Sequence, residues 1–282
     1  MNVLIVGGTG QLGRCLQDRA PTDWQVLAPS SSSLDISDHQ QVANYLATHQ
    51  VDVVINASSY NAVDQAESDA VRAYAVNAQG PENLARRARL AGAKFFHVST
   101  DYVFSGDQQR PYTEADAPSP ISVYGQSKRA GEMAVLAANP EAIVIRTAWL
   151  YSEYGRNFVK TMLALAAEDR LLTVVNDQIG TPTYAGDLAE VIIGLVARTQ
   201  VPGGLYHYAG RDALSWFEFA QAILRNVPHR LQPITSEDYP TVARRPRYSA
   251  LACRKLQAMG FAPRPQADAL EHVRRAVASV RR

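Results

Sequence analysis

Short apolar runs alternate with amphipathic stretches over the first half of the chain. Asn2–Val6 is apolar and β-rich and ends in glycines, as a buried parallel strand does. Gln11–Arg19 follows, with Leu12 and Leu16 four positions apart on one face of a predicted helix. The same alternation predicts strands at residues 24–28, 51–56, 94–99 and 142–147, and helices at residues 39–49, 66–90 and 123–138.

This order of elements predicts an α/β fold. Strands that alternate with helices form βαβ units, whose strands are parallel and whose helices cover both faces of the sheet. Because crossovers between parallel strands are right-handed, a Rossmann-type doubly wound sheet is the simplest topology. We assign residues 1–150 to this domain.

The regular alternation of strands and helices ends after Leu150. Helices are predicted at residues 158–168 and 187–197, with a strand at Leu171–Val175 between them. We expect residues 185–200 to return to the main sheet. Residues 151–184 and 201–282, with prolines scattered between short elements, predict a smaller substrate-binding lobe that closes over the first domain.

Three glycines, Gly7, Gly10 and Gly13, stand between the first predicted strand and the first predicted helix. This spacing suits a tight turn whose backbone approaches a pyrophosphate, with the helix N-terminus facing the negative charge. An ordinary strand-to-helix turn is the alternative. The position directly after a buried strand that opens the chain favours dinucleotide binding.

The sequence after the second predicted strand bears on the type of dinucleotide. An acid about 20 residues after the glycine loop would bond the ribose hydroxyls of NAD. Residues 28–33 contain neither an acid nor an arginine, and Ser30–Ser33 offers hydroxyls that can donate to a 2′-phosphate. This favours NADPH over NADH, unless the serines form only a polar loop.

Composition and charge exclude several classes of protein. With 46% hydrophobic residues the chain is not disordered, and a net charge of +1 provides no field for nucleic acid or a membrane surface. Two cysteines, Cys15 and Cys253, fit a reducing compartment, so we expect a cytoplasmic protein. No run approaches the roughly 18 apolar residues of a membrane helix.

Tyr124 and Lys128 lie four residues apart at the start of a predicted helix, on one face. A nearby ammonium stabilises a phenolate, so we expect Lys128 to lower the pKa of Tyr124 and to make it a useful proton donor. Thr100 ends an apolar strand at the same predicted sheet edge, where it can hydrogen-bond a substrate carbonyl. Surface pairs of Tyr and Lys are common, and Thr100 could simply cap the strand.

These residues, in this order, resemble the extended short-chain dehydrogenase/reductases, and more specifically the dTDP-4-dehydrorhamnose reductase family. The segments that carry the resemblance reach from residue 2 to about residue 256, nearly the whole chain. They are residues 56–64 (NASSYNAVD), 99–104 (STDYVF), 123–128 (VYGQSK), 157–159 (NFV), 177–183 (DQIGTPT) and 245–251 (RPRYSAL).

The resemblance implies reduction of the C4 ketone of dTDP-4-dehydro-β-L-rhamnose by NADPH or NADH. It also implies a role for each matching residue. Those expected to contact the cofactor are Gly7, Gly10, Gln11, Leu12, Gly13, Asp35, Ile36, Ala57, Ser58, Ser59, Tyr124 and Lys128. Tyr124, Lys128 and Thr100 are expected to be catalytic, and Thr100, Asp101 and Trp149 to hold the sugar nucleotide.

Several further positions have two interpretations on sequence alone. Trp149 is either a stacking surface for the sugar nucleotide or a core residue between the lobes, and Val63 either lines the pocket or belongs to a core. Asn157 and Gln178 either cap loops or reach the ligand. The basic run at residues 244–247 either binds a diphosphate or is solvated.

A metal site is not expected. Some relatives carry a carboxylate two residues after the third glycine, where it contributes to a magnesium site at a dimer contact. Here Arg14 and Cys15 follow Gly13, and no Cys/His cluster has zinc spacing. The number of subunits stays open, with a homodimer as one alternative.

Three other functions compete with this reduction. A 4,6-dehydratase usually carries an Asp-Glu pair after the strand-end threonine, whereas Tyr102 follows Asp101 here. A sugar-nucleotide 4-epimerase or another 4-ketoreductase shares the Tyr/Lys pair, but an epimerase does not explain residues 177–183. A non-catalytic dinucleotide-binding subunit, like the regulatory β subunit of methionine adenosyltransferase, would not need both Tyr124 and Lys128.

Overall fold

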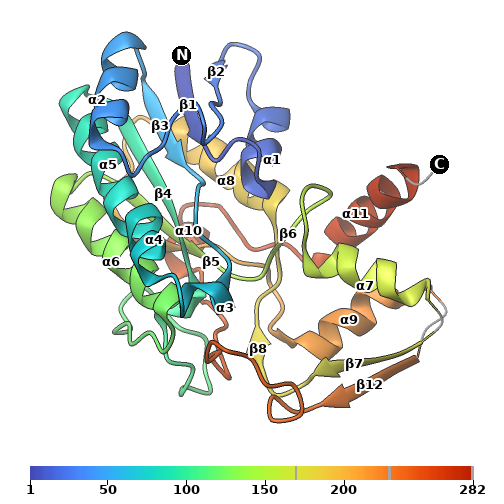
Figure 1. Cartoon of the computed structure of the whole chain (residues 1–282). Coiled ribbons are helices and arrows are strands. Elements are labelled where there is room, and N and C mark those ends of the chain that lie inside the picture. The colour runs from blue at the N-terminus through green and yellow to red at the C-terminus, as the bar shows by residue number, and fades with distance from the viewer. Residues whose placement is uncertain (169, 228–229, 281–282) are drawn as a thin grey trace.

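The computed structural model describes residues 1–168, 170–227 and 230–280 (Figure 1). Six parallel strands form its central sheet, in the order β10-β5-β4-β3-β1-β2. The strands are β1 (Asn2–Val6), β2 (Gln25–Leu27), β3 (Val53–Asn56), β4 (Lys94–Thr100), β5 (Ile143–Thr147) and β10 (Gly204–His207). The predicted doubly wound α/β fold is therefore confirmed.

Strand β1 shows how the apolar run builds two cores. Successive side chains of a strand point to opposite faces, so Val3 and Ile5 enter one core while Leu4 and Val6 enter the other. The first core is covered by α1 (Gln11–Arg19), α8 (Ala185–Val196) and α10 (Arg254–Ala258). The second is covered by α2 (His39–Thr48), α5 (Gly80–Leu90) and α6 (Val123–Ala138).

A second body of structure stands beside the carboxyl edge of the sheet, at the lower right of Figure 1. Its core lies between helices and a parallel strand pair, β7 (Leu171–Val175) with β12 (Arg230–Ile234). The helices are α7 (Phe158–Ala166), α9 (Trp216–Leu224) and α11 (Gln266–Val280). Two short pairs connect it to the sheet: β6 (Leu150–Tyr151) with β9 (Thr183–Tyr184), and β8 (Ile179–Gly180) with β11 (Leu214–Ser215).

One part of the expected lobe division is wrong. Gly204–His207, assigned above to the smaller lobe, pairs with β5 and forms the edge strand of the main sheet. Leu256 of α10 belongs to the core of that sheet as well. The strand is only four residues long and directly follows a proline and a glycine, a composition that indicates a loop.

The long helix expected at residues 66–90 is also interrupted. A short helix, α3 (Val63–Ala66), ends first, and Asp69 then leaves the helical conformation. The hydroxyl of Ser68 donates to the carbonyl of Gln65, an example of side-chain competition with helical bonding. The chain resumes as α4 (Ala70–Tyr74), a π-helical segment (Ala75–Gln79) and α5, while a 3₁₀ turn (Asp101–Val103) follows β4.

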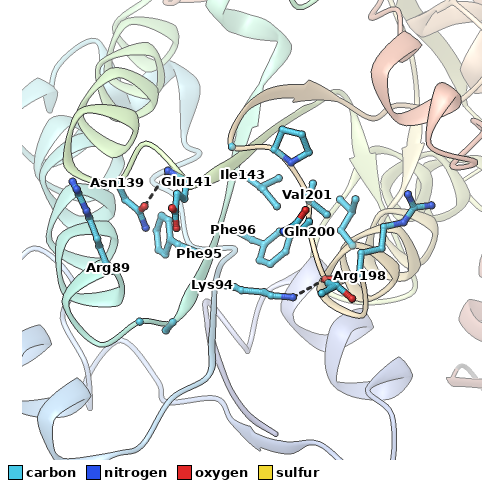
Figure 2. A pocket seen from close by; sticks show the side chains of 16 residues that line it. Arg89, Lys94, Phe95, Phe96, Asn139, Glu141, Ile143, Arg198, Gln200 and Val201 are labelled. Atoms are coloured by element: carbon cyan, nitrogen blue, oxygen red, sulfur yellow. Dashed lines mark hydrogen bonds between the residues drawn. The ribbon is translucent and has the colours of Figure 1, made fainter.

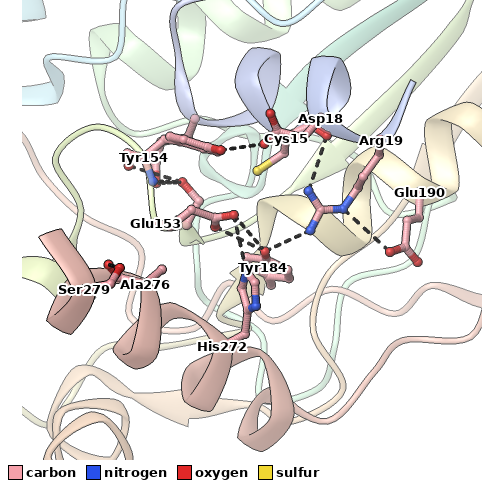
Figure 3. A network of polar contacts seen from close by, with 12 residues as sticks. Cys15, Asp18, Arg19, Glu153, Tyr154, Tyr184, Glu190, His272, Ala276 and Ser279 are labelled. Atoms are coloured by element: carbon pink, nitrogen blue, oxygen red, sulfur yellow. Dashed lines mark hydrogen bonds and ion pairs between the residues drawn. The ribbon is translucent and has the colours of Figure 1, made fainter. Parts of the chain in front are cut away.

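A polar network joins α1 to the second body (Figure 3). Arg19 of α1 donates to the hydroxyl of Tyr184, which in turn donates to the Glu153 carboxylate, at 3.0 and 3.1 Å. His272 of α11 contacts the same carboxylate at 3.4 Å. These contacts fix the segment around residue 153, next to the cavity described below.

None of the helices in the described ranges is long and apolar enough to cross a membrane.

Gly131→Ala tests how tightly α6 packs. A Cβ at this position would lie 2.0 Å from the carbonyl oxygen of Asn77, a backbone atom that cannot rotate away. We expect a loss of about 3 kcal/mol of unfolding free energy, more than the ~1 kcal/mol that alanine adds in helix propensity. Urea denaturation measures the difference. Met133→Ala, at a position that is 53% exposed on the same helix, should change stability by under about 0.5 kcal/mol. Equal midpoints for the two variants would contradict the packing described here.

Candidate active site

A cavity of about 780 Å³ opens at the carboxyl ends of β1, β3, β4 and β5. In an open parallel α/β sheet this edge is where ligands bind. The cavity collects most of the residues singled out from the sequence, from segments far apart in the chain. Its lining includes Gly7, Gly10, Gln11, Leu12, Ala57, Ser58, Ser59, Val63, Thr100, Asp101, Tyr124, Lys128 and Trp149.

The glycine loop leaves no room for side chains. Gly7 has φ +81°, and a Cβ there would lie 2.7 Å from the backbone nitrogen of Ser58. A Cβ on Gly13 would lie 2.2 Å from the Gly7 carbonyl oxygen. Gly10 is the N-cap of α1 and provides no side-chain acceptor, so the first amides of that helix stay available to an anion.

A smaller cavity of about 410 Å³ continues the first one along the sheet edge, with Gly7, Thr9, Ser58 and Ser59 shared by both. Asp35 and Ile36 line it, as does Ser31 of the serine run. The Asp35 carboxylate already accepts from the amide and hydroxyl of Ser37, at 2.9 and 2.7 Å. Together the two cavities form an elongated cleft that suits a dinucleotide.

Tyr124 and Lys128 reach the larger cavity from α6, which begins where the Ser122 hydroxyl accepts from the amide of Gly125. Lys128 is buried, and its ammonium donates to the carbonyl of Val98 on β4 at 2.7 Å. Thr100 lies at the end of the same strand. The fold therefore places the three predicted catalytic residues in one cavity.

The direction of the pKa change at Tyr124 is opposite to our expectation. Burial raises the pKa of this phenol to about 12, and the negative charge of Asp101 adds to the rise. Lys128 does not offset it, because its ammonium faces the Val98 carbonyl and its own pKa is lowered by burial to about 8. Tyr124 is therefore a firmly protonated acid.

Asp101 is the carboxyl group of the cavity. Burial raises its pKa to about 6, although hydrogen bonds oppose the rise. The hydroxyl of Thr100 donates to one carboxylate oxygen at 3.0 Å, and that of Ser249 to the other at 2.5 Å. The bond from Ser249 ties the segment at residues 245–251 to the end of β4.

Trp149 lines the cavity, and its indole is already packed against two neighbours. One face of its indole packs against Gly180, where a Cβ would lie 2.4 Å from Cε2. The other face stacks on Trp216, with ring centroids 3.5 Å apart and planes at 3°. Trp149 also has φ +46°, unusual for a large residue, which this packing enforces. The indole of Trp149 therefore explains why position 180, in the 177–183 segment, is a glycine.

Two predicted substrate-binding residues lie outside the larger cavity. Asn157 is the N-cap of α7, and its amide donates to the side-chain oxygen of Gln11 at 2.9 Å, so it orients a cavity residue from behind. Gln178 lies in a neighbouring cavity of about 460 Å³, where it donates to the Ser236 hydroxyl. Trp216 lines both cavities and stands between them.

The basic run at residues 244–247 is partly engaged already. Arg245 forms a two-pronged ion pair with Asp64, at 2.7 and 3.1 Å, and lines the neighbouring cavity. The amide of Ala243 donates to the same carboxylate. Asp64 follows the cavity residue Val63, so this contact ties the C-terminal segment to the edge of the sheet where the larger cavity opens.

Sequence reasoning missed several residues of the larger cavity, and Thr147, Arg156 and Trp216 are the most informative of them. Thr147 ends β5, and its buried hydroxyl has no hydrogen-bond partner among the described residues, so it can bond a ligand. Arg156 adds an exposed cation, and Trp216 adds the second indole. Of these three, only Thr147 could have been selected from the sequence, because it ends a predicted strand at the same sheet edge as Thr100.

Another cavity, of about 650 Å³, lies at the opposite edge of the sheet (Figure 2). Its cations are already bound to helix ends. Lys94 donates to the carbonyls of Val196 and Arg198 at the end of α8, and Arg89 donates to the Ala138 carbonyl at the end of α6. These cations cap helices.

In the part of the chain that the structure describes, no group of three or more His, Cys, Asp and Glu side chains is placed to hold a metal ion. Cys15 is buried against the sheet, and burial raises the pKa of its thiol to about 12.

The fold and the cavity together define an extended short-chain dehydrogenase/reductase. The glycine cradle, the free amides of α1 and the elongated cleft fit a dinucleotide, with Tyr124, Lys128 and Thr100 at its inner end. Residues 1–279 match the family model described as "RmlD substrate binding domain". The chain belongs to this family.

Individual relatives agree with this assignment. The chain is 42% identical to a dTDP-4-dehydrorhamnose reductase of Aggregatibacter actinomycetemcomitans, over 96% of this chain and 98% of that protein. It is 44% identical to the Mycobacterium tuberculosis reductase, over 98% and 91%. The crystal structure of the Bacillus anthracis reductase in complex with NADP superposes with a TM-score of 0.92 at 38% identity, covering 96% of this chain and 98% of that one.

The likeness to other enzymes of this architecture concerns the fold alone. A UDP-glucose 4-epimerase of Thermus thermophilus has a TM-score of 0.80 at 19% identity, and covers 97% of this chain and 99% of its own.

Gly180→Ala tests the packing of Trp149. The added Cβ would collide with the indole, so we expect the stack with Trp216 to be lost. The strong ultraviolet transitions of two indoles in contact couple and give an exciton signal in far-ultraviolet circular dichroism, which the variant should lose. Trp24→Phe, which removes the one tryptophan of the chain that is outside this stack, should retain the signal. An unchanged spectrum for Gly180→Ala would contradict the sandwich.

Proposed function

We propose that this protein reduces the C4 ketone of dTDP-4-dehydro-β-L-rhamnose to dTDP-L-rhamnose with NADPH. The convergence of Tyr124, Lys128 and Thr100 on one cavity with the glycine loop is the observation that carries the proposal. The reductases named above support it, since they match this chain over nearly its whole length.

The chain's own residues account for the proton and for the orientation of the ketone. NADPH, when bound, supplies the hydride. Tyr124 donates its phenolic proton to the C4 oxygen; because its pKa is raised to about 12, it stays protonated until that oxygen becomes strongly basic. Thr100 turns its hydroxyl from Asp101 to the same oxygen and stabilises the developing charge. Lys128 would bind the nicotinamide ribose, and the Tyr124 phenolate would regain its proton from solvent.

The sugar nucleotide then extends from this point towards the second body. Val63, Asp101 and the edge of Trp149 surround the deoxysugar, and Arg156 is available to the diphosphate. The neighbouring cavity, with Gln178 and apolar walls on α7, accommodates the nucleoside. Asn157 acts on the cofactor side, by orienting Gln11.

The adenosine half of the cleft is proposed to favour NADPH over NADH. Ser31 lines it. Asp35 is the one acid among the described residues that line it, and its carboxylate is occupied by Ser37. The NADP complex of the Bacillus anthracis relative supports this preference. Two free, buried cysteines, Cys15 and Cys253, support a cytoplasmic location.

A second substrate is favoured by one relative. The chain is 41% identical, over 93% of its length, to a protein of Streptomyces antibioticus named as a probable dTDP-4,6-dihydroxy-2-methyloxan-3-one 4-ketoreductase. The same catalytic residues would serve a related 4-ketosugar.

The direct test follows the absorbance of NADPH, and separately of NADH, with dTDP-4-dehydrorhamnose generated in situ by the upstream enzymes. We expect oxidation that depends on the sugar nucleotide, is faster with NADPH, and yields rhamnose. Oxidation of NADPH only with the other dTDP-ketosugar would favour the second candidate substrate. Cofactor binding without reduction of either ketosugar would favour an epimerase or a regulatory subunit.

Tyr124→Phe removes the proton donor and leaves the ring in place. We expect kcat to fall by about 10²–10⁴-fold, with little change in NADPH affinity measured by fluorescence titration. Tyr102→Phe is the matched control, because Tyr102 lines the same cavity and meets Tyr124 edge to face at 5.7 Å. The control should keep kcat within a few-fold. Full activity in Tyr124→Phe would refute the role given to this phenol.

A further inference from the structure

The hydroxyl of Thr100 is already engaged in this structure. It donates to Oδ1 of Asp101 at 3.0 Å and accepts from the amide of Tyr102 at 3.2 Å. A hydroxyl has a single proton to donate. Thr100 can therefore donate to a ketone oxygen only after it leaves Asp101, and Oδ1 then loses this donor.

The carboxylate of Asp101 is poorly suited to losing a donor. Only 2% of the residue is exposed. Burial raises its pKa to about 6, which still leaves it ionised at neutral pH, so it accepts hydrogen bonds and donates none. A buried charged oxygen without a donor is costly. We therefore expect another donor to reach Oδ1 when Thr100 turns away.

A hydroxyl on the carbon next to the ketone can be that donor. Both candidate substrates named above carry one: 4-dehydrorhamnose has a hydroxyl at C3 beside the C4 ketone, and a 4-hydroxy oxan-3-one has the same arrangement. Oxygens on adjacent carbons lie about as far apart as two hydrogen-bonded oxygens. This spacing matches Thr100 and Asp101, whose oxygens are 3.0 Å apart. The ketone can thus face Thr100 while its neighbouring hydroxyl faces Asp101.

Ser249 holds the opposite side of the Asp101 carboxylate. Its hydroxyl donates to Oδ2 at 2.5 Å, the oxygen that Thr100 does not use. Ser249 is itself only 2% exposed. Its amide donates to the carbonyl of Ile179, and the amide of Ile179 donates to the carbonyl of Arg247, both at 2.8 Å. Since Asp101 lines the larger cavity, a carboxylate fixed at Oδ2 keeps Oδ1 in place for a ligand when Thr100 leaves.

We propose that Ser249 is a positioning residue and that the site selects ketones with a neighbouring hydroxyl: Ser249 holds Asp101 by Oδ2, while Oδ1 exchanges the hydroxyl of Thr100 for that of the substrate. The exchange releases the Thr100 proton for the ketone oxygen. This inference rests on the proposed function for the reduction itself. It goes further by naming the feature of the substrate that prepares the site, and the residue that makes the exchange possible.

A comparison of two substrates in two proteins tests the exchange. NADPH oxidation is measured with dTDP-4-dehydrorhamnose and with its 3-deoxy analogue, in the unaltered protein and in Ser249→Ala. In the unaltered protein kcat/KM should be at least about 100-fold lower for the analogue, which leaves a buried acceptor unpaired. In Ser249→Ala the carboxylate can turn, so this ratio should shrink by about 10-fold.

The ratio between the two substrates separates positioning from a general structural effect. A variant that only loosens the fold lowers both rates together and leaves the ratio unchanged. An unchanged ratio in Ser249→Ala, or a ratio near one in the unaltered protein, would overturn the proposal. If Ser249→Ala does not fold, Ser249→Cys replaces it, because a thiol has a similar size but is only a weak donor, and the same reduced ratio is expected.

Two control variants accompany this comparison. Ser249→Thr keeps a hydroxyl at the same position and should retain most of the preference for the 3-hydroxyl. Ser99→Ala is the matched control, because Ser99 is 3% exposed and its hydroxyl donates to another buried carboxylate, that of Glu132, at 2.7 Å. It should retain the preference in full. Loss of the preference in Ser99→Ala as well would show that Ser249 has no particular role.

A binding measurement distinguishes this proposal from the proposed function. Calorimetry on the protein with NADP⁺ compares dTDP-L-rhamnose with its 3-deoxy analogue and needs no turnover. If the unaltered protein prefers the 3-hydroxyl and Ser249→Ala loses that preference, but neither ketosugar is reduced, the proposed function fails and the role of Ser249 stands. If dTDP-4-dehydrorhamnose and its 3-deoxy analogue are reduced equally fast, the proposed function stands and this proposal fails. No preference in either binding or rate overturns it too.

Discussion

Close backbone packing around α6 is the constraint on which the catalytic arrangement depends. A Cβ on Gly125 would lie 2.3 Å from the Tyr102 carbonyl oxygen, and one on Gly131 would lie 2.0 Å from that of Asn77. Because neither contact leaves room for a side chain, α6 has a single position relative to the end of β4 and to the π-helical segment. Tyr124 and Lys128 therefore enter the cavity from a helix that cannot slide, opposite a strand end that carries Thr100.

This packing has an electrostatic consequence. The helix is pressed so closely onto the sheet that its polar side chains are buried, and burial disfavours every charged form. It raises the pKa of Tyr124 and of Asp101 and lowers that of Lys128. The result is a cavity whose phenol is held as an acid beside a buried ammonium. Behind it, Glu132 and Arg146 are buried as an ion pair, which places no net charge in the core.

The sequence predicted local elements well wherever an element has its own periodicity and its own end signals. The bounds of β1, α1, α6 and β7 agree with the structure to the residue. Prediction failed where local signals were weak or in conflict. The edge strand Gly204–His207 is too short to show a period, and the break at Asp69 depends on side-chain bonds that compete with a helical pattern.

The sequence by itself determined the alternation of strands and helices, the glycine loop and the spacing of Tyr124 and Lys128, because each depends on residues a few positions apart. Only the tertiary structure decided which distant residues meet. Arg245 reaches Asp64 across 181 positions, and Asn157 reaches Gln11 across 146. Trp149 meets Trp216, and Glu132 meets Arg146, because helices and strands that are separate in the chain pack together. No local pattern encodes such pairs, since a side chain's partner is set by the packing of whole elements and not by its neighbours in sequence.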